Sequence, residues 1–373
     1  MKLTLKHDDF QRAFMTAATV APSRSPREIL QNVKLQAEGN QLILTATDGE
    51  VGIRLVLPDV QVHIPGSALI PVHRLSMILR ETSDEELVIE ATPERTLIEG
   101  RFSRFDLQAQ NADEFPAVKD FSGDDAYEMT ADDFRDLIRR TIFATDTESS
   151  RFALGGVLLE FEGDHVTAVG TDGRRLAKME KPIKVKGQPL APETSTIVPA
   201  RSMQLMERIM GDGDIPVYLI PQGNHLLMKF PNGVFYTTLV EGRFPKWRDV
   251  IPRRPESTRI DIPVGPTYAA VRQAAVVVND ESRGIDFNFT DGTLVLTSSV
   301  QQVGKTRVEM PVSYAGAGLT ISLDNRFISD FLKVLPPEKT FTLEVESPDQ
   351  AAHCKTDDNY DYIVMPMSKE QPR

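Results

Sequence analysis

Three tandem α+β domains, each with two helices packed on antiparallel sheets, are the fold that this sequence predicts. Two observations lead to this prediction. Similar segments recur at a period near 125 residues along a chain of 373 residues, so three periods account for its whole length. Within each period, stretches with a helical pattern of apolar residues alternate with stretches that have the pattern of strands. Such a period is too long for a solenoid, whose units reach about 50 residues, and is typical of repeated domains.

Three series of segments support the repeat. A helix pattern with an aromatic residue near its start recurs at Phe10, Phe134 and Tyr268, with spacings of 124 and 134 residues. A strand that runs into a helix recurs with equivalent positions at Pro71, Pro199 and Leu323, with spacings of 128 and 124. A strand pair recurs in QLILTATDGE, HVTAVGTDGRRLA and GTLVLTSSVQ, where the first two Thr-Asp steps lie 124 residues apart. The alternative is a succession of strands and helices without common ancestry.

The helix pattern is clearest in the second and third repeats. Apolar residues and one threonine follow the i, i+3, i+4, i+7 spacing of a buried helix face at Phe134, Leu137, Ile138 and Thr141. Thr130 is the expected N-cap, because acidic residues follow it in the first turn. The same spacing recurs at Ile328, Phe331, Leu332 and Leu335, before Pro336-Pro337 ends the helix. The helices are predicted at 8–20, 72–81, 131–144, 200–210, 267–278 and 325–335.

Strands are predicted from alternation and from the turns that end them. Leu42, Leu44 and Ala46 alternate with Ile43, Thr45 and Thr47. Asp-Gly turns follow at Asp48-Gly49, Asp172-Gly173 and Asp291-Gly292. We place the domain boundaries near 121–123 and in the proline-rich stretch 251–257, which predicts domains at 1–122, 123–252 and 253–373.

Composition excludes several classes of protein. The chain is 40% hydrophobic and 26% charged, which is ordinary for a soluble protein with buried cores. A net charge of −12 argues against a simple basic nucleic-acid-binding protein. The single cysteine, Cys354, excludes an intrachain disulfide and a cysteine-based metal site, so we expect a cytoplasmic protein. The N-terminus becomes acidic within ten residues, and no apolar run approaches the roughly 18 residues of a membrane span.

No motif of catalysis or metal binding stands out. The six histidines lack metal-ligand spacing, and we interpret them as surface or half-buried residues. Gly211 and Gly213 follow a predicted helix and are better interpreted as its C-terminal turn than as a phosphate-binding loop. The Asp-Gly turns lack the alternating ligands of a calcium loop. We therefore expect neither an enzyme nor a bound cofactor or metal, although the many carboxylates leave an acid/base pair possible.

Charge is unevenly distributed along the chain. The six predicted helices together carry +3, which leaves −15 for the remainder. If the helices shared one face, that face would be mildly basic and would suit phosphates without reading bases. Ordinary solvent-exposed helix faces would give the same count.

Four phrases together resemble one protein family. They are RFALGGVLLE from Arg151, GTDGRRLA from Gly170, EGRFP from Glu241 and VMPM from Val364. In this order they resemble the β sliding clamp of bacterial DNA polymerase III holoenzyme, and the resemblance covers nearly the whole chain. It implies the DNA clamp fold, in which two chains pair head to tail and close into a homodimeric ring of six domains. It also implies a non-catalytic processivity factor that encircles double-stranded DNA without reading its sequence.

The resemblance implies a pocket for partner peptides between the second and third domains. Its predicted residues are Leu154, Thr171, Gly173, Arg174, Arg175, Leu176, Pro245, Val250, Ile363, Met365, Pro366 and Met367. Methionine is flexible and polarizable, and suits surfaces that accept several partners. The implied partners are the replicative DNA polymerase, the clamp loader and other proteins with a clamp-binding peptide. Residues 368–373 continue past Met367, and their charges are expected at the rim of the pocket.

The resemblance also implies a dimer interface and DNA contacts. The predicted interface residues are Arg74, Arg104, Phe105, Leu107, Val276 and Val277. Where better-known members have an acidic edge, this chain has VQQVGK at 300–305, so the ion pairs of the interface differ here. The predicted DNA-binding residues are Arg24, Arg80, Arg151, Phe152 and Arg201, and Ala153 replaces a second aromatic residue found in some members.

Two rival functions remain open from the residues. One is a hydrolase built on repeated α+β domains, which would need a cleft with two carboxylates of perturbed pKa. The other is a diverged clamp relative that only scaffolds or inhibits, which would need a spoiled pocket. The intact Thr171–Leu176 and Met365–Met367 segments favour the clamp over the second rival.

Overall fold

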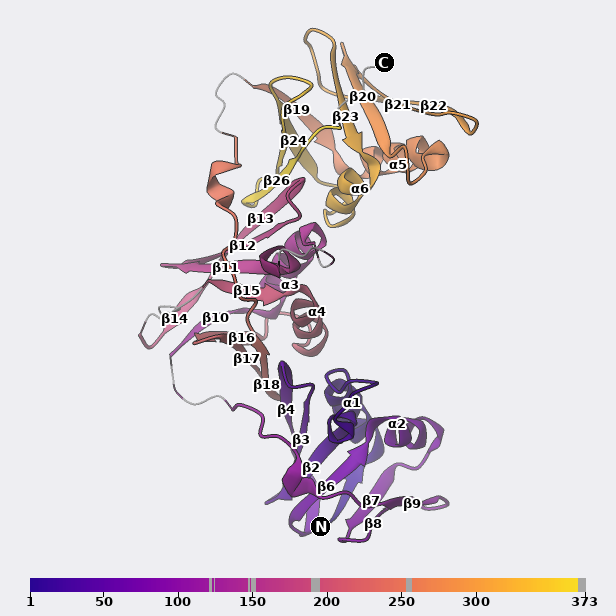
Figure 1. Ribbon diagram of the computed structural model, residues 1–373, viewed down its shortest axis with the longest axis vertical. Coiled ribbons are helices and arrows are strands. Elements are labelled where there is room, and N and C mark those ends of the chain that lie inside the picture. The colour runs from indigo at the N-terminus through magenta and orange to yellow at the C-terminus, as the bar shows by residue number, and fades with distance from the viewer. Residues whose placement is uncertain are drawn as a thin grey trace. The chain divides into compact units, whose positions relative to one another are not determined.

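The computed structural model describes residues 1–120, 123, 125–146, 148, 152–188, 195–252 and 257–367. These residues form two compact units (Figure 1). The first unit combines Met1–Asp132 with Lys184–Leu239, and the second combines Asp133–Ile183 with Val240–Arg373.

The helices of the described part begin and end close to the predicted positions. They are α1 (His7–Ala18), α2 (Val72–Glu81), α3 (Ala131–Thr141), α4 (Ala200–Ile209), α5 (Val264–Ala274) and α6 (Asn325–Lys333). The predicted helices at 131–144 and 267–278 end early as α-helices because their last residues form 3-10 turns, η3 (Ile142–Ala144) and η6 (Ala275–Val277). Within the first unit α1 packs on α2, and within the second α5 packs on α6.

The first unit contains two antiparallel sheets. One has the strand order β14-β10-β16-β17-β18-β4-β3-β2-β6, and the other has the order β5-β1-β7-β8-β9. The strands are β1 (Lys2–Lys6), β2 (Asn32–Glu38), β3 (Gln41–Thr47), β4 (Val51–Leu57), β5 (Gln61–Ile64), β6 (Gly66–Pro71), β7 (Glu86–Ala91), β8 (Arg95–Glu99), β9 (Arg104–Gln108), β10 (Ala126–Thr130), β14 (Lys184–Lys186), β16 (Pro216–Gln222), β17 (His225–Phe230) and β18 (Gly233–Thr238). The short strand β15 (Thr196–Pro199) leads into α4.

The second unit also contains two antiparallel sheets. One includes the order β11-β12-β13-β26-β25-β24-β19, and the other has the order β22-β21-β20-β23. The strands are β11 (Gly156–Glu162), β12 (His165–Thr171), β13 (Arg175–Pro182), β19 (Thr258–Pro263), β20 (Gly284–Thr290), β21 (Thr293–Val300), β22 (Gly304–Pro311), β23 (Leu319–Asp324), β24 (Thr340–Val345), β25 (Ala352–Lys355) and β26 (Tyr360–Val364).

One strand pair in each unit joins segments of different repeats. In the first unit β4 pairs with β18, and Leu55 lies opposite Gly233. In the second unit β13 pairs with β26, and Met179 lies opposite Tyr360. We call these pairs the first junction (β4–β18) and the second junction (β13–β26). Because each pair continues a sheet from one repeat into the next, the compact units divide the chain differently from the predicted domains.

The repeat is confirmed at the level of individual hydrogen bonds. The Thr47 hydroxyl donates to the carbonyl of Val51 (2.6 Å), and Asp48 Oδ1 accepts the amides of Glu50 and Val51 (both 2.9 Å). In the second repeat Thr171 and Asp172 make the same three bonds to the residues after them, at 2.7, 2.9 and 2.9 Å. The turn at Asp291-Gly292 is not their equivalent, since it connects β20 to β21.

The predicted helix faces are buried. Phe134, Leu137, Ile138 and Thr141 are fully buried, as are Phe10 and Phe14 on α1. In the core of the second unit, Phe331 stacks on Tyr362 with ring centroids 4.8 Å apart. The interpretation of all six histidines as surface or half-buried residues is wrong for two of them. His7 and His353 are buried, and each has polar partners, including the Leu79 carbonyl for His7 and Asp361 for His353.

Candidate partner-binding patch, dimer edges and DNA contacts

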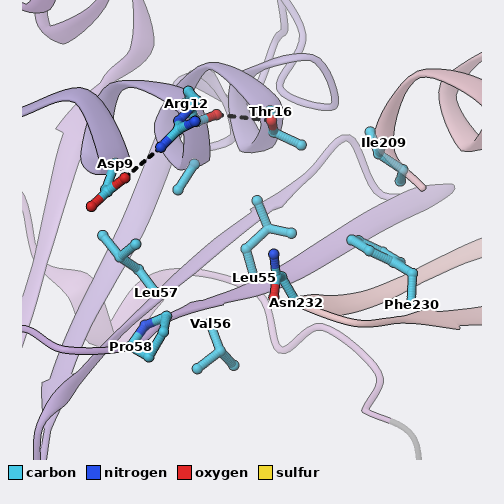
Figure 2. Close-up of a pocket in the computed structure, with 11 residues that line it drawn as sticks. Asp9, Arg12, Thr16, Leu55, Val56, Leu57, Pro58, Ile209, Phe230 and Asn232 are labelled. Atoms are coloured by element: carbon cyan, nitrogen blue, oxygen red, sulfur yellow. Dashed lines mark hydrogen bonds and ion pairs between the residues drawn. The ribbon is translucent and has the colours of Figure 1, made fainter. Parts of the chain in front are cut away.

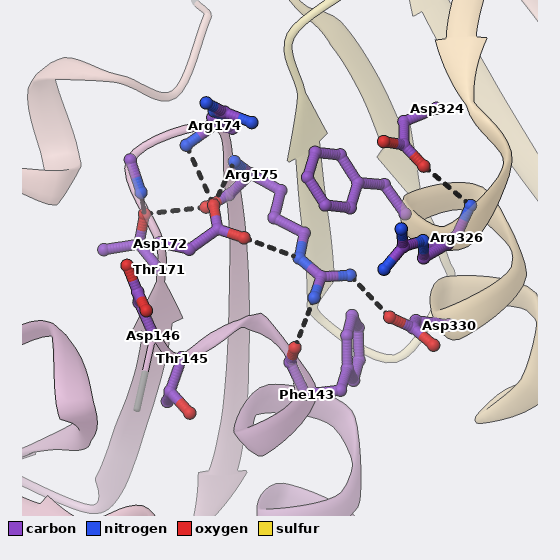
Figure 3. Close-up of polar contacts among 12 residues, drawn as sticks. Phe143, Thr145, Asp146, Thr171, Asp172, Arg174, Arg175, Asp324, Arg326 and Asp330 are labelled. Atoms are coloured by element: carbon purple, nitrogen blue, oxygen red, sulfur yellow. Dashed lines mark hydrogen bonds and ion pairs between the residues drawn. The ribbon is translucent and has the colours of Figure 1, made fainter. Parts of the chain in front are cut away.

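The predicted pocket residues Thr171, Gly173, Arg174 and Arg175 belong to a Thr-Asp-Gly turn that connects β12 to β13. Gly173 has φ +86°, a backbone conformation that favours glycine, and its amide donates to the Thr171 hydroxyl at 3.1 Å. The Asp172 carboxylate binds the amides of Arg174 and Arg175. These bonds fix the turn, so Arg174 projects as an exposed side chain while Arg175 enters the protein (Figure 3).

Arg175 connects the turn to two other elements. Its guanidinium donates to Asp330 on α6 (2.7 Å), to the Phe143 carbonyl (2.6 Å) and to Asp172 (3.0 Å). It also lies over the Phe327 ring, 4.4 Å from its centroid. Burial alone would lower the pKa of Arg175, but the oxygens of Tyr362, Asp330 and Asp172 outweigh it and raise that pKa. Arg175 therefore ties the turn to α6 and η3, and its side chain is only 10% exposed (Figure 3).

The end of β26 leaves the sheet beside this turn. The Met365 amide donates to the Arg174 carbonyl (2.9 Å), and the Met367 amide donates to the Ser322 carbonyl (2.8 Å). These two bonds hold the last described residues in an extended path over the surface. The side chains stay open to solvent, with Met365 47% and Met367 37% exposed. Large exposed apolar side chains held on an ordered backbone are typical of a binding surface.

The remaining predicted pocket residues divide into a buried set and a more exposed set. Leu154, Thr171, Leu176 and Ile363 are buried. The strand register places Thr171 opposite Leu176, and Leu176 opposite Ile363, so these three share one end of the sheet. Pro245 is exposed and Val250 is 48% exposed. Pro366 is half-buried. We call Pro245, Val250, Met365, Pro366 and Met367 the methionine patch.

The segment that presents Pro245 and Val250 is anchored by residues that the sequence analysis did not name. The Trp247 indole donates to Glu160 on β11 (3.2 Å). Arg248 lies over the Trp247 ring at 4.3 Å and forms ion pairs with Glu160 and Glu162 at 2.9 and 2.8 Å. The sequence signal was the aromatic-basic pair Trp247-Arg248, one residue after the EGRFP phrase. Asp330, Phe143 and Phe327 were also missed, because they lie far from Arg175 in the sequence.

Three of the predicted dimer residues lie on the edge strand β9, two lie on η6 and one lies on α2. Phe105 and Leu107 are half-buried on β9, and Arg104 on the same strand is exposed; β9 is the last strand in its sheet. Val276 is 78% exposed on η6, and Val277 is half-buried beside the start of β22, which is the last strand of another sheet. Arg74 is exposed on α2. An uncovered edge strand offers unpaired backbone groups to another chain.

Two exposed apolar residues beside these edges were not predicted. Phe102, at the tip between β8 and β9, is 87% exposed, and Val303, before β22, is 58% exposed. The Arg101 guanidinium lies over the Phe102 ring at 4.9 Å. The signal that could have identified them is their position in the sequence, close to the predicted interface residue Phe105 and to the segment 300–305.

The predicted DNA-binding arginines lie in different settings. Arg24 and Arg80 are exposed, and Arg80 is in the last turn of α2. Arg201 is 59% exposed and forms an ion pair with Asp48 at 2.7 Å, so part of its charge is already compensated. Arg151 and the side chain of Phe152 lie outside the described residues, as do residues 189–194 and 368–373.

Neither a metal cluster nor a membrane span is found in the described part of the chain. Its His, Cys, Asp and Glu residues form no group of three or more that could hold a metal ion. The helices described are all too short or too polar to cross a bilayer. Cys354 is fully buried, which raises the pKa of its thiol above the ordinary range.

Repeated α+β domains that share sheets, with an exposed apolar patch at one junction, define a scaffold that binds other macromolecules. Three family models match the chain in order, and all three describe the DNA polymerase III beta subunit. They are the N-terminal domain over residues 1–119, the central domain over 128–246 and the C-terminal domain over 248–368. This chain belongs to that family of non-catalytic sliding-clamp subunits.

Several relatives show how far the likeness extends. The beta sliding clamps of Pseudomonas aeruginosa and Escherichia coli K12 are 29% and 28% identical over 374 residues, which covers 98% of this chain and 100% of each relative. The crystal structure of the P. aeruginosa DNA polymerase III subunit beta matches with a TM-score of 0.91 at 26% identity, over 98% of this chain and 100% of that one. A P. aeruginosa clamp bound to griselimycin matches with a TM-score of 0.92 at 27% identity, over 99% of this chain and 100% of that one.

Proposed function

We propose that two copies of this chain close head to tail into a ring around double-stranded DNA, and that the methionine patch tethers the replicative polymerase and other partners to it. The ordered match of three clamp domains along residues 1–368 is the observation that supports this proposal most strongly. The grip on DNA is topological, so the polymerase stays near its template because the ring cannot dissociate. We place this activity in the cytoplasm.

An acidic chain suits this mechanism. With a net charge of −12, the protein repels stray DNA from most of its surface. Each phosphate that is neutralised releases counterions and strengthens binding, so a strongly basic lining would slow sliding. A few exposed arginines such as Arg24 and Arg80 provide a weak attraction without base recognition. Loading the ring requires a separate clamp loader.

The test of topological binding uses nicked circular DNA. The ring, loaded by a clamp loader, is expected to stay on nicked circular DNA through gel filtration at high salt and to be lost after the circle is cut once. Equal retention on circular and linear DNA would contradict the topological mechanism. This experiment also separates the clamp from the hydrolase and from a relative that only scaffolds, since neither needs a closed circle.

The methionine patch is tested by truncation of its side chains. Met365→Ala with Met367→Ala should weaken binding of a glutamine-, leucine- and phenylalanine-containing partner peptide by at least about 100-fold, because buried apolar anchors dominate such interfaces. Fluorescence anisotropy measures the affinity. Met77→Ala is the matched control, since Met77 is 49% exposed on α2. Unchanged affinity in the double variant would refute the patch as the binding surface.

The dimer edges are tested by charge. Val276→Asp should shift the dimer toward monomer, because a carboxylate would be buried in an apolar contact. Ile64→Asp, at a residue that is 54% exposed on β5, is the control. Sedimentation velocity at several concentrations distinguishes the two species. A Val276→Asp protein that remains as dimeric as the control would exclude this edge from the interface.

A further inference from the structure

The edge strands β9 and β22 each carry a row of charged side chains. On β9 the exposed residues Arg104 and Asp106 alternate with Phe105 and Leu107, which are half-buried. β9 is the last strand of its five-stranded sheet, and β22 is the last strand of its four-stranded sheet. A strand at a sheet edge can be continued by a strand of another chain, so the side chains of these two edges determine which strand they accept.

β22 shows the same alternation. Lys305, Arg307 and Glu309 are exposed, whereas Thr306 and Val308 between them are half-buried. The residues opposite the three charged positions on β21 are uncharged: Ser299, Thr297 and Val295. Two cations and one acid therefore stand at this edge, and Lys305 forms no ion pair within the described part of the chain.

The other charges at these edges have exposed partners within the chain. Asp106 lies 3.2 Å from Arg95, and both side chains are about half exposed. Arg307 lies 2.5 Å from Glu309 on its own strand, and both side chains are more than half exposed. Ion pairs between side chains this exposed contribute little to stability, because solvent screens them. These charges can therefore exchange partners when another chain covers the edge.

Antiparallel pairing of β9 with β22 brings the two charged rows together. Their neighbours within the sheets, β8 and β21, already pair with them in antiparallel orientation. Residues directly opposite each other in such a pair lie on the same face, so the exposed row of one strand meets the exposed row of the other. Phe105 then meets Thr306 or Val308 on the half-buried face. A change of register that keeps this match shifts the strands by two residues.

Two registers place Asp106 opposite a cation. When Asp106 lies opposite Arg307, its diagonal neighbour is Lys305, and when it lies opposite Lys305, its diagonal neighbour is Arg307. Diagonal neighbours are still within reach of long side chains. A shift in the other direction places Asp106 opposite Glu309, and like charges directly opposite each other are destabilising. Both favourable registers leave Asp106 beside two cations, and in both Glu309 is opposite or diagonal to Arg104.

We propose that Asp106 of one copy forms ion pairs with Lys305 and Arg307 of the partner subunit when β9 and β22 of two copies pair. This inference rests on the proposed head-to-tail ring and names the charges that hold its strands in register. The interface residues inferred from the resemblance contain two arginines and no acid, and the segment 300–305 contains no acid either. Asp106 supplies an acid from the opposite strand, and the same pairing recurs at both contacts of a dimeric ring.

Reversal of the charges tests the proposal. Asp106→Lys places like charges beside Lys305 and Arg307 and should raise the dissociation constant of the dimer about tenfold. Lys305→Asp with Arg307→Asp should weaken the dimer at least as much. The protein with all three substitutions has the ion pairs inverted, and its dissociation constant should return to within about threefold of the wild-type value. Fluorescence-detected sedimentation velocity over a range of concentrations, in about 0.1 M salt, measures these constants.

Two further variants separate this pairing from net charge and from folding. Asp113→Lys makes the same charge change at an exposed residue of η2 (Ala112–Glu114), which packs against β6, and should leave the dissociation constant unchanged. Asp106→Asn removes the charge with little change of shape. It should weaken the dimer about threefold and reduce the further weakening at high salt, because salt screens only the pairs that are present.

Three results would overturn the proposal while a dimeric wild type leaves the ring intact. They are an unchanged dissociation constant in Asp106→Lys, a triple variant as weak as Asp106→Lys, and an equal weakening by Asp113→Lys. A wild-type chain that stays monomeric at every concentration would refute the ring, and this inference with it.

Discussion

The two junctions use the same backbone pairing and differ in what their side chains do. Both place a Thr-Asp-Gly turn at one end of a strand pair. In the first junction the Thr238 amide donates to the carbonyl of Glu50, and in the second the Met365 amide donates to the carbonyl of Arg174, both at 2.9 Å. Each accepting residue is the one that follows the glycine of the turn. The second junction is reinforced by buried charge and ends in exposed methionines. The first has an exposed ion pair, a cavity of about 400 Å³ beside α1 (Figure 2) and Thr238 with a buried Leu239. A duplicated backbone thus provides two sites whose properties depend on a few side chains.

The Arg175 side chain, which is only 10% exposed beside the second junction, gives the largest expected effect. Arg175→Ala leaves Asp172 and Asp330 without their partner and should lower the local free energy of opening by about 3 kcal/mol. Arg201→Ala, which removes the ion-pair partner of Asp48 in the first unit, should cost less than about 1 kcal/mol, because Arg201 is 59% exposed and solvent screens the pair. Amide hydrogen exchange of β13 and β18 measures both changes. Equal losses at the two junctions would contradict the contrast in burial.

A single glycine tests the packing of the first junction. A Cβ atom added at Gly52 would lie 2.3 Å from Tyr236 Cε1, so Gly52→Ala should destabilise the β4–β18 pair by about 2 kcal/mol through overpacking. Combining it with Tyr236→Leu should recover most of the loss, since the clashing ring is removed. Hydrogen exchange of β4 provides the measurement. A tolerated Gly52→Ala, or a double variant with no recovery, would show that the strands relax by another route.

Acid should affect the second junction before the first. Burial alone would raise the pKa of Asp358, but the hydrogen bond from Thr356 and the charge of Arg140 lower that pKa overall. An aspartate whose pKa is lowered in the native state stabilises that state at pH values above the ordinary aspartate pKa of about 3.9. This stabilisation is lost as the pH falls through the native pKa. Protection of β26 amides should therefore decline below about pH 4, and Asp358→Asn should weaken this dependence. An unchanged profile in the variant would exclude Asp358 as the cause.

The smallest effect on stability is expected for the two exposed methionines at the end of the second junction. Met365→Thr and Met367→Val place the residues of the first junction at the end of the second, where the side chains are about half exposed. The free energy of unfolding, measured by urea titration, should change by less than about 0.5 kcal/mol, because surface substitutions rarely change it by more. A large loss of stability would mean that the methionines hold the fold rather than bind partners.

The helices and turns were predictable because their signals are local. The apolar stripes of α3 and α6 and the Thr-Asp-Gly turns need only neighbouring residues to specify them, and all were found where expected. The family phrases likewise located the exposed methionines. Residues that act through distant partners were not recognised, since Arg175 and Asp330 are 155 positions apart. His353 was misjudged for the same reason: its burial depends on β24 and β26.

By itself the sequence determined that three related α+β domains follow one another and that a Thr-Asp-Gly turn and a methionine-rich end exist. Periodicity and turn chemistry are properties of short segments, and the chain displays them directly. Only the tertiary structure decided that β4 pairs with β18 and β13 with β26, that the Arg175 side chain is 10% exposed while Arg174 is exposed, and that a cavity opens beside the first junction. These outcomes depend on which side chains from remote segments occupy the same volume.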